Sequence, residues 1–134
     1  DVANVIPSVA DIYFEMGKVT SDDYDKHWMG AINTEFAHLG MQRMIAFRDA
    51  GNDHRFFDIH FAPFQKDPFP KLAELYHWLG EELSDEALAR MRAWRENSPR
   101  DKHGGHSYDA AEFGIDLATL RQRFSFYSDR FGIN

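Results

Sequence analysis

The sequence predicts a mainly helical single unit over residues 1–134, with about five helices and one short strand. Apolar residues recur at steps of three and four along most of the chain, which is the spacing of one helix face. Residues that start and stop helices bracket these stretches, and one short run alone is rich in β-forming side chains. With 43% hydrophobic and 15% aromatic residues, the chain can build a core, so a disordered chain is excluded.

The first predicted helix lies at the start of the chain and ends at Gly17. Its apolar stripe covers residues 2–16 at helical spacing. Asn4 is the predicted cap. That choice places Pro7 and Ser8 in the first turn, where backbone N–H groups have no partner within the helix and a proline removes no hydrogen bond.

A long second helix is predicted after Ser21, because two aspartates follow it where the helix dipole favours negative charge. It is expected to run to Gly51-Asn52, with local weakening at Gly30 and Gly40. Its predicted buried face consists of Tyr24, Trp28, Ile32, Phe36, Leu39, Met44 and Phe47.

The run Arg55–Phe61 is the one predicted strand. A lone strand leaves its N–H and C=O groups unpaired, and burying each such group costs about 1–3 kcal/mol. We therefore expect the partner strand to lie outside this sequence. The chain also opens at Asp1 without Met or a signal-peptide pattern, so the true N-terminus is expected upstream.

Three further helices are predicted in the second half of the chain. Residues 67–80 begin with an Asp-Pro pair, in which aspartate caps the helix and proline takes its first position. Residues 84–98 begin with a serine cap and stop before a proline. Residues 100–115 are expected to form a loop, and residues 116–132 form the last helix between an aspartate and a glycine.

Charge and composition exclude several function classes. The 22 acidic and 15 basic residues give a net charge of −7, which argues against an overall nucleic-acid binder. With no cysteine there is no disulfide framework, thiolate metal site or thiol nucleophile, and a reducing cytoplasm fits best. No apolar run approaches the roughly 20 residues that a membrane span needs.

A basic stretch interrupts the acidic chain between residues 90 and 106, where five lysines and arginines stand against two acidic residues. Its glycine pair lets backbone N–H groups approach an anion closely while neighbouring cations neutralise it. The stretch is compatible with a phosphate clamp, but its composition alone fits equally a solvated helix face followed by a flexible loop, so both interpretations stay open. The candidate anion ligands are Arg100, Lys102, His103, Gly104, Gly105 and His106.

Ser8 is a further candidate, because a hydroxyl in the first turn adds a donor to the positive end of the helix dipole. The alternative is a locally bonded serine. His103 and His106 lack the third-ligand pattern of a zinc site, so no metal is predicted. The sequence also has no G-x-x-x-x-G-K-[ST], G-x-S-x-G or G-x-G-x-x-G pattern, and no complete catalytic set is found.

Three stretches together resemble the C-terminal part of bacterial sulfotransferases that use PAPS (3′-phosphoadenosine 5′-phosphosulfate). They are DVANVIPS at residues 1–8, the segment from FFDIHF to LG at residues 56–80, and the segment from NSPRDKHGGHSY to the final FG at residues 97–132. The resemblance implies an α/β P-loop-like fold with a central parallel sheet, of which this chain is a mainly α fragment. It also implies that the 5′-phosphosulfate loop and the catalytic base lie upstream of Asp1.

On this resemblance, Ser8 matches the serine that helps bind the 3′-phosphate of PAPS. The segment 100–106 matches the loop that closes over the nucleotide. Asp101 stands where similar sequences often have glycine, and Ser107 stands where a basic residue is common. The arginine that usually accompanies the serine would fall just before Asp1.

The resemblance implies transfer of a sulfuryl group from PAPS to a hydroxyl or amine of a small-molecule or glycan acceptor, by an enzyme that is incomplete in this chain alone. The alternative is a non-catalytic helical module that binds a protein or an anionic ligand. A strand with two open edges pairs readily with other chains, so we expect a homo-oligomer or a second chain that completes the fold.

Overall fold

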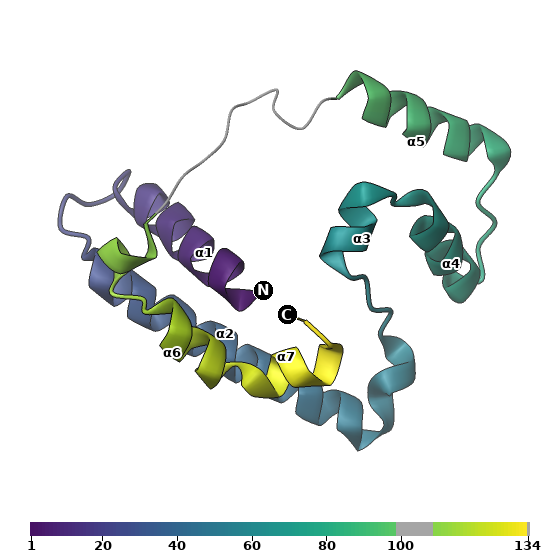
Figure 1. Ribbon diagram of the computed structural model, residues 1–134. Helices are drawn as coiled ribbons and strands as arrows, with labels where there is room; N and C mark the ends of the chain where they lie inside the picture. The colour runs from purple at the N-terminus through teal and green to yellow at the C-terminus, as the bar shows by residue number, and fades with distance from the viewer. Residues whose placement is uncertain (99–108, 134) are drawn as a thin grey trace. The chain divides into compact units, whose positions relative to one another are not determined.

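The computed structural model describes residues 1–98 and 109–133 of the chain (Figure 1). Within these ranges it contains seven α-helices, three short helical turns and no strand. The chain divides into two compact units, one formed by Asp1–Ala50 with His106–Asn134 and one formed by Gly51–Gly105. None of the described helices is long and apolar enough to cross a membrane.

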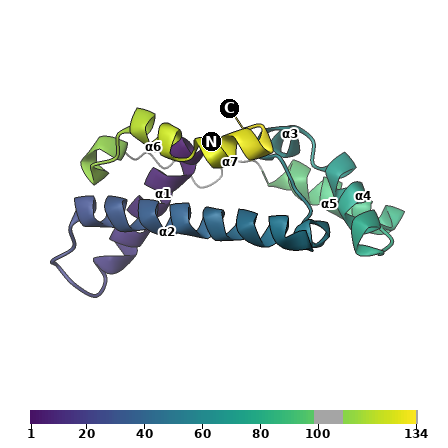
Figure 2. The same cartoon turned by 90° about the horizontal axis from the view of Figure 1, so that it is seen from below.

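The first unit is built around one long helix. This helix, α2 (Lys26–Phe47), continues into a π-helical turn, η1 (Arg48–Asn52). Figures 1 and 2 show α1 crossing beside α2, while α6 and α7 follow one another along it. The bounds of the other elements are α1 Val2–Gly17, η3 Ala110–Phe113, α6 Leu117–Arg123 and α7 Ser125–Phe131.

The core of this unit forms where α1, α2, η3 and α6 meet. The ring of Phe14 packs edge-on against Phe113, with 6.0 Å between the ring centroids. Apolar side chains from these four elements and their junctions exclude water, which is the main source of their stability. The buried members are Val2, Ile6, Ala10, Met29, Phe113, Ile115, Leu120 and Phe124.

Helix α1 begins earlier than its sequence pattern predicts. The carboxylate of Asp1 accepts a hydrogen bond from the Ala3 amide at 3.0 Å and caps the helix, so the predicted cap at Asn4 is wrong. Pro7 and Ser8 are therefore the sixth and seventh residues of α1, inside the helix and not in its first turn. Pro7 is buried, and its missing N–H omits one bond of the helix.

Helix α2 begins later than predicted. Asp25 is its cap and accepts from the Trp28 amide at 2.9 Å. Ser21 lies in the turn before the helix, where its hydroxyl accepts from the Asp23 amide at 3.2 Å. Both serine and aspartate cap well, so sequence alone did not distinguish the two starts.

The predicted buried face of α2 is correct only in part, since Tyr24 and Ile32 are half-buried against the core. Trp28 and Phe36 on that face are 57% and 67% exposed, whereas Met29 and Gly30 are buried. A Cβ atom built on Gly30 would lie 2.0 Å from the carbonyl oxygen of Phe113, so only glycine permits this approach. Because the Phe113 backbone comes this close, α2 must face it with a residue that has no side-chain bulk.

The second unit contains α3 (Phe61–Lys66), α4 (Phe69–Leu79) and α5 (Asp85–Asn97), preceded by the 3-10 turn η2 (Asp53–Arg55). The predicted serine cap of α5 is confirmed, because the Ser84 hydroxyl accepts from the Ala87 amide at 3.2 Å. No side chain of residues 51–98 is fully buried.

The fold class predicted from sequence, a fragment of an α/β fold with five helices and one strand, is wrong for the described residues. The predicted strand Arg55–Phe61 begins in η2, is extended only over residues 56–60 and then enters α3. A strand requires a neighbour to pair with its backbone, and the described residues form no second strand.

The predicted last helix is also divided into α6 and α7. Phe124 has φ −101° and ψ 13° between them and is completely buried. The break lets two rings contact His38 edge-on, with centroid distances of 5.4 Å to Phe124 and 5.3 Å to Phe126. Contact with α2 therefore outweighs continuation of the helix.

We predict that Gly30→Ala destabilises the chain by about 1–3 kcal/mol, because the added methyl group must push the Phe113 backbone away from α2. Gly40→Ala is the matched control in the same helix, since its Cβ meets no atom within 4 Å. That variant should gain about 0.5–1 kcal/mol from helix propensity. Urea denaturation measures both, and equal effects of the two substitutions would contradict the close approach.

Candidate functional site

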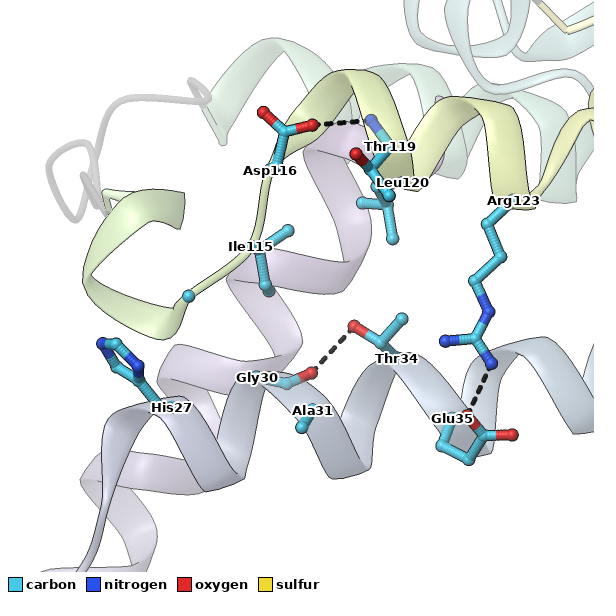
Figure 3. Close-up of a pocket in the computed structure, with 11 residues that line it drawn as sticks. His27, Gly30, Ala31, Thr34, Glu35, Ile115, Asp116, Thr119, Leu120 and Arg123 are labelled. Carbon is cyan, nitrogen blue, oxygen red and sulfur yellow. Dashed lines mark hydrogen bonds and ion pairs between the residues drawn. The ribbon is translucent and has the colours of Figure 1, made fainter.

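A pocket of about 500 Å³ lies in the first unit, between α2 and the segment that joins η3 to α6 (Figure 3). Its volume falls in the range of small-molecule sites. Four titratable side chains stand among its lining residues, together with two threonines. The lining consists of His27, Gly30, Ala31, Thr34, Glu35, Gly114, Ile115, Asp116, Thr119, Leu120 and Arg123.

An ion pair joins the two sides of this pocket. Arg123 of α6 donates from Nη2 to Oε2 of Glu35 on α2 at 2.5 Å (Figure 3). The hydrogen bond and charge of Arg123 hold the pKa of Glu35 below its ordinary value. Both side chains remain partly exposed, so solvent screens the pair and its effect on stability is small.

The second carboxylate of the pocket belongs to Asp116, which caps α6. It accepts from the Thr119 amide at 2.7 Å, as its place in the sequence predicts. Hydrogen bonds from the side chain and backbone of Thr119 lower the pKa of Asp116. Glu35 and Asp116 are therefore both anionic at neutral pH.

The remaining polar groups lie on α2. The Thr34 hydroxyl donates to the carbonyl oxygen of Gly30 at 2.8 Å and keeps its lone pairs as acceptors. His27 stands against Gly114, where an added Cβ would lie 3.2 Å from the imidazole Nδ1. Gly114 has φ +65°, a conformation that glycine adopts without strain, and it turns the chain from η3 toward α6.

This arrangement suits a ligand that donates hydrogen bonds. Two carboxylates, two threonine hydroxyls and one imidazole line the pocket, and its one guanidinium is already paired with Glu35. A hydroxyl or amine can donate to such acceptors, whereas a phosphate would be repelled by them. Within residues 1–98 and 109–133, no group of three His, Asp or Glu side chains could hold a metal ion.

None of the residues predicted from sequence as anion ligands is among the lining residues of this pocket. Ser8 is half-buried on α1 and does not line the pocket. Its position inside α1 corrects the expectation of free amide groups beside it. The other six predicted ligands, at positions 100 and 102–106, lie outside the described residues.

Sequence analysis missed most of the pocket because its members are distant in the chain. Glu35 and Arg123 are separated by 88 residues, and no local motif connects them. Asp116 was recognised, but only as the start of a helix. Helical spacing places Thr34 one turn after Gly30 on the same face of α2. The spacing does not predict, however, that α6 lies opposite this face.

We predict that Glu35→Gln reduces the loss of stability in acid. The pKa of Glu35 is lower in the folded chain than its ordinary value of 4.5, so its stabilising effect is complete above that value and disappears as pH falls through the folded pKa. Denaturation of both proteins between neutral pH and pH about 3 measures this difference. Arg123→Gln should reduce the loss of stability in acid in the same way, and the double variant should show no larger effect than either single one. Identical acid profiles for the unaltered chain and the variants would contradict the prediction.

Comparison with known proteins gives one informative result. No family model matches the chain, and no curated protein matches it. Among solved structures, the chain is similar to the crystal structure of sulfotransferase STF9 from Mycobacterium avium, with a TM-score of 0.85 and 25% sequence identity. The match covers 100% of this chain and 35% of that protein. The chain therefore has a sulfotransferase-like fold and spans about a third of the length of that enzyme.

Proposed function

We propose that this chain is the C-terminal part of a PAPS-dependent sulfotransferase and that it helps bind the donor nucleotide. The observation that carries this proposal is the likeness to a sulfotransferase over the whole chain, at a TM-score of 0.85. The sequence resemblance supports it separately, because it rests on residues 1–8, 56–80 and 97–132 and not on the fold.

Ser8 is the proposed ligand of the 3′-phosphate of PAPS. It stands half-buried on α1, and a hydroxyl can donate to a phosphate oxygen. Asp1, at the start of the same helix, pairs with Arg121 at 2.9 Å, so its negative charge is partly compensated. The partial exposure of Ser8 and the compensated charge of Asp1 support Ser8 as the proposed phosphate ligand.

The segment Arg100–His106 is the proposed second part of the nucleotide site. Guanidinium, ammonium and imidazolium groups bind phosphate oxygens through charge-assisted hydrogen bonds, and glycine amides can approach an anion closely. When bound, PAPS would supply the sulfuryl group that passes to a hydroxyl or amine of a small-molecule or glycan acceptor. The residues of this chain would hold and orient the nucleotide, and none is assigned to the transferring group.

A second candidate function is a helical module that binds a protein without catalysis. The observation that favours it is the exposed apolar face of α2, where Trp28 and Phe36 are open to solvent. Large exposed apolar patches mark interaction surfaces. Such a module would act by association alone and would not need PAPS.

The proposed donor site predicts weak, salt-sensitive binding of adenosine 3′,5′-bisphosphate to the 134-residue chain, measured by calorimetry. Lys102→Ala should weaken binding by about 1.5–3 kcal/mol, the value of a hydrogen bond to a charged group. Ser8→Ala should weaken it less, because a neutral hydrogen bond contributes about 0.5–1.5 kcal/mol. Lys66→Ala, outside the segment, is the control. Unchanged titrations for both Lys102→Ala and Ser8→Ala would place the nucleotide elsewhere.

If the protein bound by this second candidate is another copy of the chain, it self-associates through α2, and sedimentation velocity at micromolar concentration tests this. We expect a dimer or larger species that Phe36→Glu shifts toward monomer, because a buried carboxylate opposes the contact. Gln42→Glu, an exposed position on the same helix, adds the same charge as a control. A monomer at all concentrations would exclude α2 as a self-association surface.

A further inference from the structure

A second cavity, of about 440 Å³, lies entirely within the second unit. It is a groove between α5 and the segment that runs from α3 into α4. Six of its eight lining residues are apolar, two are arginines, and none is acidic. The lining consists of Phe64, Pro68, Phe69, Leu72, Arg90, Met91, Trp94 and Arg95. Its size suits a small ligand and not a whole helix.

Arg95 is held in place at this groove by neutral partners. Its Nη2 donates to the carbonyl oxygens of Gln65 at 2.8 Å and Lys66 at 3.0 Å, which end α3. No carboxylate of the described residues pairs with it. Within residues 1–98 and 109–133 the guanidinium charge is therefore not compensated by a carboxylate, and its Nε and Nη1 groups are available as donors.

The other two arginines of α5 differ from Arg95. Arg92 lies over the ring of Phe69 at 4.1 Å, closer than Arg95, whose guanidinium is 5.8 Å from the same ring. Arg90 pairs with Glu86 at 2.6 Å, so its charge is already compensated. Arg95 therefore supplies positive charge to the lining of the groove, although residues 51–98 as a whole carry more acidic than basic side chains.

The apolar part of the groove is open to solvent. The side chain of Trp94 is 71% exposed, while Leu72 and Met91 are half-buried beside it. Covering this surface would remove apolar area from water, which is favourable. A ligand that fits must therefore combine an apolar body with a negative head group.

We propose that the groove of the second unit binds a small amphiphilic anion. Its apolar body, a ring or a short chain, packs against Leu72, Met91 and Trp94, and its head group accepts hydrogen bonds from Arg95. Either a carboxylate or a sulfate can occupy the head-group position, because both accept charge-assisted hydrogen bonds from the Nε or Nη1 groups of Arg95. The inference is independent of the proposed sulfotransferase function, because it uses none of the residues assigned to the nucleotide.

Three probes that share a naphthalene ring test this site on the full chain. Naphthalene-2-sulfonate and 2-naphthoate carry the charge, and 2-naphthol is neutral at pH 7. We expect both anions to bind, and the naphthol to bind roughly tenfold or more weakly, as measured by calorimetry and tryptophan fluorescence. Salt should weaken binding of the anions only. The two anions together show which head group the site prefers.

Two variants locate the site. Met91→Glu adds a carboxylate to the groove and should abolish binding of both anions. Arg95→Met keeps an apolar stem, and should weaken the anions about tenfold or more while 2-naphthol binding stays unchanged. That unchanged binding also shows that the groove remains folded. Arg43→Met, on α2 of the other unit, is the control for loss of one positive charge.

Equal affinity for the neutral and anionic probes would overturn the proposal, and so would anion binding that survives Met91→Glu. If the Arg95→Met variant no longer binds 2-naphthol either, the groove is altered in that variant. The difference in affinity between the charged and neutral probes on the unaltered chain then tests the proposal. A dimer that dissociates on Met91→Glu without any probe would show that a second copy of the chain fills the groove, which would also overturn the proposal.

Discussion

The close approach of Phe113 to Gly30 is the constraint on which the first unit depends. No Cβ fits between the Phe113 carbonyl and α2, so the contact fixes which face of that helix is buried. It also fixes the start of the segment that leads to Ile115 and Asp116. The pocket between α2 and α6 follows directly from it, because Gly30, Ile115 and Asp116 are among its lining residues.

Local features of the fold could be predicted from sequence. Ser84 and Asp116 cap their helices as expected, and Gly80 and Gly132 end theirs with positive φ. These features depend only on neighbouring residues, whose chemistry is visible in the sequence. Which face of α2 is buried depends instead on a residue more than 80 positions away, and apolar periodicity carries no such information.

The difference between local and long-range contacts also explains which residues of the two cavities the sequence did not predict. Arg123 meets Glu35, and Arg95 meets the end of α3, through contacts between distant parts of the chain. The anion ligands that the sequence predicts at positions 100 and 102–106 are continuous but lie outside the described residues, and Ser8 is a separate candidate on α1. A pattern of adjacent residues can therefore suggest an anion site, which stays a prediction here, whereas a pocket formed by distant residues leaves no such pattern.

The two cavities differ in the charge of their lining residues, and therefore in the ligands that suit them. The pocket of the first unit presents anionic Glu35 and Asp116, which disfavours a phosphate, and Ser8 is not among its lining residues. The groove of the second unit is positive and apolar. A ligand hydroxyl that donates a hydrogen bond suits the pocket of the first unit. An amphiphilic anion suits the groove of the second unit.

The most direct test of the sulfotransferase assignment is to map adenosine 3′,5′-bisphosphate on the 134-residue chain by amide chemical shifts in nuclear magnetic resonance. The account predicts that the largest shifts occur at Ser8 and at residues 100–106, while the amides of Thr34, Glu35 and Trp94 remain unmoved. Shifts confined to either cavity, or no shifts at saturating nucleotide, would contradict it.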